Sequence, residues 1–266
     1  MIRQKINTHF EDSQVLRQYL DSLPDSFENG GNILWDGRNK IKSFTLNGTS
    51  SQGRPQALNM VVKRFKHMSL IQKLGYVFHS HKAHRAFRNG LRLIERGIDT
   101  PTPIAYVELR HGLLITDAFY LSSPTGLRSI EGEIDRDDWN RNIARDFALF
   151  VAELHSKGIL HHDLNDTNVL FRLARNDTYK FQLIDINRMK FYTNPKSISE
   201  HDLIENLTRF TGRMELFEFV VRQYALARQL PNVNAFVVRA IRQKELHDKR
   251  WRQRKTFLAH FKHKKK

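Results

Sequence analysis

The secondary-structure pattern changes part-way along this chain of 266 residues, and the change limits the folds that the chain can adopt. The first part has short runs of β-branched and aromatic residues separated by turns, whereas long amphipathic helical patterns dominate from Trp139 onwards. Strands followed by helices, without regular alternation, are typical of an α+β protein. The sequence therefore predicts a small N-terminal lobe built on an antiparallel sheet and a larger, mainly helical C-terminal lobe.

In the first part, three strands and one helix are followed by two further strands. The predicted elements are strands at 33–35, 41–46 and 57–65, a helix from Lys82 to Arg96, and strands at 104–109 and 113–116. A turn at Asp36–Asn39 and a loop at 47–55 separate the first three strands. Apolar residues at three- and four-residue spacing mark the helix, and Gly97 ends it.

In the second part, a strong helix from Asn142 to Lys157 ends at Gly158. Two short apolar segments, 168–171 and 179–186, form a hairpin after this helix, and 200–242 is mostly helical by pattern. The sequence therefore divides into an N-terminal lobe at 1–116, a C-terminal lobe at 117–248 and a basic amphipathic tail at 249–266.

Composition excludes several classes of protein. The hydrophobic fraction of 40% and the aromatic fraction of 11% are typical of a globular protein rather than of a disordered one. No apolar run approaches the roughly 20 residues that span a bilayer, and the first residues lack the apolar core of a signal peptide. The absence of cysteine excludes disulfides and thiolate metal sites, and it is compatible with the cytoplasm, where we expect the protein.

The net charge of +16 is the one unusual bulk property, and it favours an anionic partner. The excess is concentrated, because 62–96 holds nine Lys and Arg against one acid and 239–266 holds twelve against two. A nucleic acid, an acidic membrane surface or a phosphorylated substrate would match this charge, and a solvated surface without a partner is the plain alternative. No RNA- or DNA-binding motif accompanies the charge, which disfavours a nucleic acid.

One loop has the residue spacing of a phosphate-transfer site. His161, Asp163 and Asn168 follow the pattern His-x-Asp-x-x-x-x-Asn, in a polar loop between the strong helix and a short apolar strand. Phosphoryl transfer needs a carboxylate that orients the attacking hydroxyl, and it needs oxygen ligands for Mg²⁺ beside the phosphates. Asp163 and Asn168 lie five positions apart, so one loop can direct both side chains toward the same point.

Two further residues extend this pattern. Asp185 ends an apolar run seventeen residues after Asn168, where a strand would hold its backbone and present its carboxylate to a metal. Lys63 lies in the third predicted strand, and an ammonium facing a nucleotide can hold its α- and β-phosphates. Strand alternation puts Val62 and Arg64 on the opposite face. A capped turn at Asp185 and an exposed strand lysine are the structural alternatives.

The segments VVKRF, GIDTPTPIAYVE, HHDLNDTNVLF and LIDINRM resemble the bacterial lipopolysaccharide core kinases, which phosphorylate Kdo or heptose sugars of the inner core. The resemblance runs from about Ile33 to past Asn206. It implies a two-lobed, protein-kinase-like fold with a nucleotide-binding first lobe, ATP and Mg²⁺ as cofactors, and a lipid-anchored anionic sugar as substrate. It also implies residue roles: Asp163 as catalytic base, Asn168 and Asp185 as Mg²⁺ ligands, and Lys63 as the phosphate-binding lysine.

Two departures from the family pattern bear on activity. No Gly-x-Gly-x-x-Gly loop precedes Lys63; the turn residues Gly37, Arg38 and Asn39 are the candidates for covering the phosphates, with a plain hairpin turn as the alternative. Arg88 stands where the family's helix places a glutamate partner for Lys63. Glu95, the only acid of that helix, lies two turns later, about 10 Å along the axis. Either Glu95 substitutes in a displaced helix, or Lys63 is held otherwise, or activity is reduced.

The tail at 249–266 alternates basic residues with large apolar ones. As a helix it would carry Trp251, Leu258 and Phe261 on one face bordered by Lys and Arg, which is typical of a segment that lies on an anionic membrane surface. A helix docked on its own lobe, followed by a solvated end, is the alternative.

These observations together predict ATP-dependent phosphorylation of a sugar hydroxyl, on Kdo or heptose of a lipopolysaccharide inner core. The tail adds peripheral contact with the cytoplasmic face of the inner membrane. A kinase of protein or of another small molecule would share the same site residues. A pseudokinase-like binding module would fit Arg88 and the missing glycine loop. The sequence leaves open which hydroxyl is phosphorylated and the oligomeric state.

Overall fold

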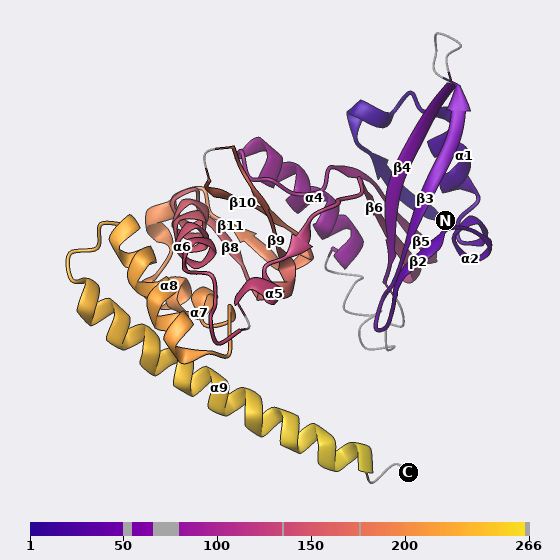
Figure 1. The fold of residues 1–266 in the computed structure, drawn as a ribbon. Coiled ribbons are helices and arrows are strands. Elements are labelled where there is room, and N and C mark those ends of the chain that lie inside the picture. The colour runs from indigo at the N-terminus through magenta and orange to yellow at the C-terminus, as the bar shows by residue number, and fades with distance from the viewer. Residues whose placement is uncertain (50–54, 66–79, 135, 176, 264–266) are drawn as a thin grey trace. The chain divides into compact units, whose positions relative to one another are not determined.

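The computed structural model describes residues 1–49, 55–65, 80–134, 136–175 and 177–263 (Figure 1). The chain forms two compact units. One comprises Met1–Gly126 with the short segment Asp185–Arg188, and the other comprises Leu127–Ile184 and Met189–Lys266. The predicted boundary after residue 116 falls inside strand β6 (Leu114–Ser122), which pairs with β5 as far as Ser122, so the first unit continues to Gly126.

The first unit contains a six-stranded antiparallel sheet in the order β1-β5-β6-β4-β3-β2. The other strands are β1 (Ile2–Ile6), β2 (Asn32–Asp36), β3 (Lys40–Thr49), β4 (Pro55–Arg64) and β5 (Pro103–His111). All five strands predicted for this part are present. The turn between β2 and β3 has the predicted residues, and the Gly37 N–H donates to the Asn39 C=O across it (3.1 Å). The predicted loop at 47–55 is shorter, because the β3–β4 pairing continues to Thr49 and Pro55; residues 50–54 lie outside the described ranges.

Residues 1–30 add elements that the sequence analysis did not predict. Strand β1 pairs with β5, and a 3-10 turn, η1 (Thr8–Phe10), leads to the helices α1 (Gln14–Asp21) and α2 (Asp25–Asn29). The helices pack on one face of the sheet, in a core that combines Leu16, Leu20 and Phe27 with Met60, Val62 and Phe119.

Helix α4 (Lys82–Glu95) packs beside the other face of the sheet, where Ala83 and Phe87 contact Phe65 of the chain that leaves β4. Val62 thus points into the core under α1 and α2, whereas Phe65, three positions later, points to α4. This alternation is the one predicted from the sequence, and it assigns Lys63 to the same face as Phe65.

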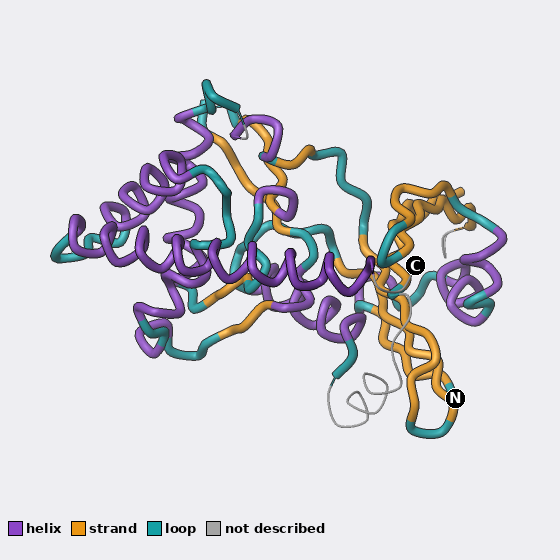
Figure 2. The backbone as a smooth tube through the Cα atoms, turned by 90° about the horizontal axis from the view of Figure 1, so that it is seen from below, coloured by secondary structure: helices purple, strands orange, loops and turns teal. Residues whose placement is uncertain are grey.

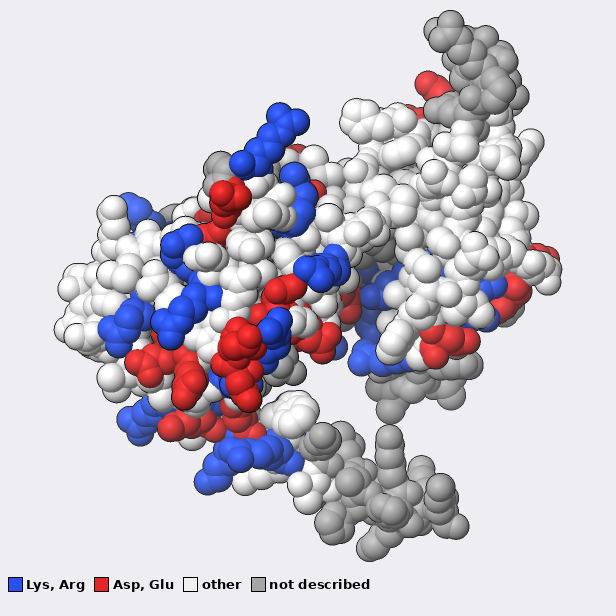
Figure 3. Space-filling model, in the orientation of Figure 1, with Lys and Arg blue, Asp and Glu red and all other residues white. Residues whose placement is uncertain are grey.

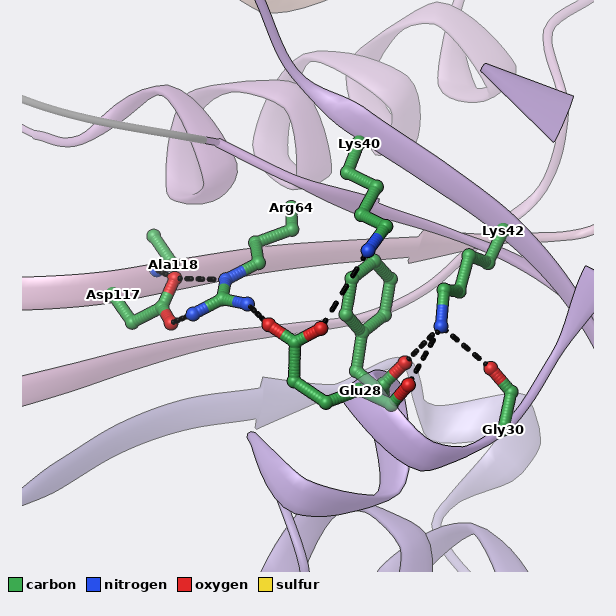
Figure 4. A network of polar contacts seen from close by, with 8 residues as sticks. Glu28, Gly30, Lys40, Lys42, Arg64, Asp117 and Ala118 are labelled. Carbon is green, nitrogen blue, oxygen red and sulfur yellow. Dashed lines mark hydrogen bonds and ion pairs between the residues drawn. The ribbon is translucent and has the colours of Figure 1, made fainter. Parts of the chain in front are cut away.

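A polar network lies under α2, on the face opposite Lys63 (Figure 4). Arg64 of β4 donates to both carboxylate oxygens of Asp117 on β6 and also to the carboxylate of Glu28 on α2. Lys40 of β3 pairs with the same glutamate (3.6 Å). The network therefore connects α2 to three strands, and it gives Arg64 a structural role that is distinct from that of its neighbour Lys63.

Lys42 of β3 is a buried cation held by backbone carbonyl groups. Only 4% of this residue is exposed, and its ammonium donates to the carbonyl oxygens of Phe27 (2.6 Å), Glu28 (3.0 Å) and Gly30 (2.8 Å). Carbonyl groups at the C-terminal end of a helix lack intrahelical donors and carry partial negative charge. The three donors of one lysine therefore satisfy three acceptors at the end of α2 (Figure 4).

Replacing Lys42 by methionine is expected to destabilise the protein by about 2 kcal/mol, because buried carbonyl groups lose a charged donor. The measurement is the free energy of unfolding from urea titrations followed by circular dichroism. Lys40→Met is the matched control, since it removes a partly exposed ion pair two residues away and should cost less than about 1 kcal/mol. Equal losses for the two variants would contradict the role assigned to Lys42.

The second unit is mainly helical. Its helices are α5 (Glu131–Ile134), α6 (Arg141–Ser156), α7 (Glu200–Leu207), α8 (Met214–Ala227) and α9 (Val233–His263). Its strands are β7 (Arg128–Ser129), β8 (Ile159–His161), β9 (Val169–Leu173), β10 (Tyr179–Leu183) and β11 (Met189–Phe191), in the orders β10-β9-β7 and β11-β8. Stacked rings fill its core: Phe147 lies on Phe210 (4.1 Å between centroids) and Tyr224 on Phe236 (5.8 Å).

The predicted helix after Trp139 and the hairpin that follows it are both present. Helix α6 stops before Gly158, whose φ of 72° is the left-handed conformation that ends many helices. Strand β10 stops at Leu183, earlier than the predicted residue 186, because Asp185 turns the backbone and residues 186–188 form a 3-10 helix, η3 (Ile186–Arg188).

Helix α9 is one continuous helix, from Val233 to His263, so the predicted tail at 249–266 begins inside it (Figure 2). Its first turns pack against α7 and α8, with Phe236, Val237 and Ala240 buried. The side chains at 257–263, which include the predicted apolar residues Leu258 and Phe261, lie outside the described part. None of the helices within the described ranges combines the length and the apolar composition needed to cross a bilayer.

Candidate active site

In the second unit, the predicted catalytic loop connects β8 to β9. The backbone of Asp163 is fixed on both sides, because its N–H donates to His161 Nδ1 (3.2 Å) and its C=O accepts from Asn168 Nδ2 (2.9 Å). Asn165 caps a 3-10 turn, η2 (Asp166–Asn168), by accepting from the Asn168 N–H (3.0 Å). The Asn168 amide nitrogen is thus committed to the loop, which leaves its Oδ1 as the atom that can ligate a metal.

A chain of hydrogen bonds anchors this loop to three helices of the same unit. The buried His161 bonds the Ile184 C=O through Nε2 (3.0 Å), and its own C=O accepts from Asn206 Nδ2 on α7 (2.6 Å). Asn206 Oδ1 bonds His155 Nε2 on α6 (2.9 Å), and His155 Nδ1 bonds the Tyr224 hydroxyl on α8 (2.8 Å). Each imidazole therefore has one donating and one accepting nitrogen, which assigns the neutral Nε2–H tautomer to both.

The sequence analysis missed His155, Asn206 and Tyr224, because their contribution depends on contacts between residues far apart in the chain. Burial lowers the pKa of His155 to about 4; the bond to Asn206 opposes the shift and the charge of Arg228 adds to it. The ring therefore stays neutral in the folded protein well below the pKa of about 6.5 that an unfolded histidine has. Between these two values only the unfolded chain takes up a proton at this position, so folding is weakened as the pH falls.

On going from pH 7.5 to pH 5.0, His155 is expected to lower the stability of the protein by about 2 kcal/mol. This loss is measured as the change in urea midpoint between the two values of pH, and it should be smaller in His155→Gln than in the wild type. His201→Gln removes an exposed histidine of α7 and is the control, with an unchanged pH dependence. A wild-type pH dependence in His155→Gln would show that this ring is not the titrating group.

In the first unit, the two other principal site residues form an ion pair. Lys63 Nζ lies 2.8 Å from Asp185 Oδ1, and the same oxygen accepts from Asn187 Nδ2 (2.6 Å). Asp185 has a φ of 51°, a left-handed conformation that is uncommon for a non-glycine residue, although aspartate adopts it more readily than most. The bonds to Lys63 and Asn187 hold the carboxylate in this geometry.

Helix α4 holds the segment that follows Asp185 through amide and glycine residues. Asn89 is buried and donates from Nδ2 to the Ile186 C=O (2.8 Å). A Cβ at position 90 would lie 2.4 Å from Pro103 Cγ and 3.2 Å from Ile186 Cδ1, so only glycine allows this approach. Asn89 and Gly90 are therefore positioning residues that the sequence analysis did not identify.

Lys63 is held by Asp185 rather than by an acid of α4. Arg88 and Glu95 are both exposed. The sequence left three alternatives open for the missing helix glutamate: substitution by Glu95, another partner for Lys63, or reduced activity. The ion pair with Asp185 is such another partner.

Positive charge gathers around this ion pair in the first unit. Burial lowers the pKa of Lys82, the first residue of α4, and the charges of Arg38 and Arg188 lower it further, while Asp185 opposes them. Arg38 belongs to the predicted phosphate-covering turn with Gly37 and Asn39, and it is exposed. Such a group of cations suits a polyphosphate better than a neutral ligand.

The two predicted metal-ligand side chains, one in each unit, are of the chemical kinds that Mg²⁺ uses. No group of three or more His, Asp or Glu residues is clustered as a metal cage in the part of the chain that the structure describes. Mg²⁺ in nucleotide sites uses one or two protein oxygen ligands together with phosphate oxygens and water. The carboxylate of Asp185 and the amide oxygen of Asn168 are ligands of this kind. When bound, the ion would neutralise charge on the phosphates.

Comparison with known proteins identifies the family to which the chain belongs. The profile of the Lipopolysaccharide kinase (Kdo/WaaP) family matches residues 51–228. Over 154 residues the chain is 29% identical to the 3-deoxy-D-manno-octulosonic acid kinase of Xylella fastidiosa (strain M23). The matched stretch covers 53% of this chain and 58% of that protein. The enzyme of the same name from Vibrio vulnificus (strain YJ016) is 25% identical over 143 residues, or 51% of this chain and 61% of that protein.

The solved structure of WaaP in complex with acyl carrier protein superposes with a TM-score of 0.55 and 16% identity, over 91% of this chain and 98% of that one. At this identity the likeness concerns the fold, and it confirms the predicted protein-kinase-like fold. The chain belongs to the Lipopolysaccharide kinase (Kdo/WaaP) family. It spans 58% of the length of the first of the curated relatives that it matches.

Proposed function

We propose that this protein is an ATP-dependent kinase that phosphorylates a hydroxyl of Kdo in the lipopolysaccharide inner core, in the cytoplasm. The proposal rests on two groups of residues. One unit contains the loop with Asp163 and Asn168, and the other contains the ion pair between Lys63 and Asp185. These four residue types supply what phosphoryl transfer requires: a carboxylate for the hydroxyl, oxygen ligands for Mg²⁺, and a cation for the phosphates.

In this proposal, Asp163 accepts the proton of the attacking sugar hydroxyl, or orients that proton, as the oxygen bonds to the γ-phosphorus and ADP leaves. Lys63 would bind the phosphates, which requires its ammonium to exchange at least part of its contact with Asp185 for phosphate oxygens. Asn168 and Asp185 would hold Mg²⁺. The turn residues Gly37, Arg38 and Asn39 would contribute backbone N–H groups and one guanidinium to the phosphates.

Kdo is preferred to heptose for two reasons. The two relatives named above are both 3-deoxy-D-manno-octulosonic acid kinases, and Kdo is an acidic sugar that suits a protein of net charge +16. Heptose stays the alternative acceptor, because the family match identifies a lipopolysaccharide kinase without fixing the sugar that this chain phosphorylates.

The acceptor is tested with purified protein, Mg²⁺ and ATP labelled in the γ-phosphate. The acceptors are lipid A that carries Kdo alone, a core that also carries heptose, and lipid A without either sugar. Label in both Kdo-containing acceptors supports the proposal, whereas label only in the heptose-containing core would move the assignment to heptose. Transfer to a generic protein substrate but to none of these glycolipids would contradict the proposal.

A further inference from the structure

The C-terminal half of α9 has a different environment from its first turns. Near the middle of the helix Lys244 is buried and pairs with Asp248 (2.7 Å), and His247 contacts the same carboxylate (3.2 Å). Both acidic residues of 239–266, Glu245 and Asp248, precede residue 249. From residue 249 the helix continues beyond α7 and α8 of its own unit (Figure 1).

Residues 249–254 form a short, exposed basic segment, KRWRQR, on this part of the helix. Its cations are Lys249, Arg250, Arg252 and Arg254, and none of them forms an ion pair within the described ranges. Figure 3 shows Lys and Arg side chains gathered on α9 ahead of the residues drawn in grey. Arg250 and Arg254 lie one turn apart, and like charges at this spacing destabilise a helix in water. An anionic surface would remove that repulsion.

Trp251 distinguishes a membrane surface from other anionic partners. It is 56% exposed in the middle of the basic segment. Tryptophan is favoured at the boundary between lipid headgroups and hydrocarbon, where its ring is apolar and its N–H is hydrated. The sequence of α9 then adds Phe257, Leu258 and Phe261 before the helix ends. Large apolar residues among basic ones on a helical backbone are typical of helices that lie in the plane of a membrane.

We propose that the C-terminal half of α9, from residue 249, is a peripheral membrane anchor that binds anionic lipid headgroups through its exposed cations and inserts Trp251 at the interface. The anchor binds lipid without ATP and without the sugar acceptor. Its failure would therefore leave the proposed kinase activity untouched, and failure of the kinase activity would leave the anchor untouched.

The test is sedimentation of the whole protein with vesicles, at low and at high salt. Vesicles of equal parts phosphatidylglycerol and phosphatidylcholine should bind the protein, and pure phosphatidylcholine vesicles should not. Because each basic residue near an anionic surface contributes on the order of 1 kcal/mol, Arg250→Glu/Arg252→Glu/Arg254→Glu should lower the partition constant at least about tenfold. Salt should release the wild type.

The matched control is Arg172→Glu/Arg175→Glu/Lys180→Glu, which changes the net charge equally on an exposed hairpin of the same unit. It should bind vesicles within about threefold of the wild type. Circular dichroism shows whether each triple variant is folded. If one of them is unfolded, the release of the wild type from anionic vesicles by salt tests whether charge drives the binding. Trp251→Phe should lose the blue shift of tryptophan fluorescence that anionic vesicles produce in the wild type.

Three outcomes would overturn the anchor. The wild type could fail to bind anionic vesicles, the two triple variants could lose binding equally, or the fluorescence could shift without Trp251. Binding of an oligonucleotide at a salt concentration where vesicles do not bind would assign the segment to nucleic acid instead.

Discussion

Replacing Asp163 by alanine lowers the rate of phosphoryl transfer by about 10²- to 10⁴-fold, the usual contribution of a positioned general base. The substitution leaves the bonds of Asp163 to His161 and Asn168 in place, because its backbone N–H and C=O make them. The loop should therefore keep its conformation, and the loss should appear in kcat with little change in KM for ATP. The measurement is steady-state transfer of labelled γ-phosphate to the Kdo acceptor.

Asp166→Ala is the control for this prediction. Asp166 lies in the same loop, and its carboxylate accepts from the Thr167 N–H (2.9 Å), a local bond within η2. Its loss should change the rate by less than about tenfold, in line with a residue that shapes the loop but does not meet the reacting hydroxyl. A comparable loss in both variants would mean that loop conformation, rather than the Asp163 carboxylate, limits the rate.

Replacing Lys63 by methionine should lower kcat/KM for ATP by about 10²- to 10³-fold, which is the effect of removing one charged donor from developing negative charge. Methionine keeps most of the aliphatic volume of the side chain, so the effect reports the ammonium. Lys63 also neutralises the carboxylate of Asp185. Its removal takes one positive charge away from this carboxylate and should in addition weaken the binding of ATP. Nucleotide affinity is measured by calorimetry with a non-hydrolysable ATP analogue and Mg²⁺.

The neighbouring residue is the control for Lys63. Arg64 lies on the opposite face of β4 and bonds Asp117 and Glu28. Arg64→Met should lower the urea midpoint while leaving kcat/KM within a few-fold of the wild type. Lys63→Met should lower kcat/KM while leaving the urea midpoint nearly unchanged. If the activity losses of the two variants were the same, the division of β4 into a structural face and a nucleotide face would be wrong.

The parts of the fold that follow from the sequence are those with strong local signals. The strands β2 to β6, the helices α4 and α6, and the turn at Gly37 to Asn39 have periodicity or turn chemistry that few other structures match. The missed part, residues 1–30, has short helices whose stability comes from packing on the sheet, through Leu16 and Phe27, rather than from a long periodic pattern. Because the packing involves residues far apart in the chain, these helices could not be predicted from the local sequence.

The same distinction applies to the site. Asp163, Asn168 and Asp185 are predicted from their spacing along the chain, and Lys63 is predicted from its place on a strand. The anchoring residues Asn89, Asn187 and Asn206 are ordinary asparagines in sequence. They become informative only when folding joins Asn89 to Ile186 and Asn206 to His161. The pairing of Lys63 with Asp185, in place of a helix glutamate, likewise becomes evident only in the folded structure.

The most direct measurement of the central claim is mass spectrometry of the lipopolysaccharide core from cells that carry the wild-type gene, the Asp163→Ala gene or no gene. One phosphate on Kdo is expected with the wild-type gene, and it should be absent in both other strains. A core that keeps the same phosphate in all three strains, with the wild-type protein expressed, would contradict the claim.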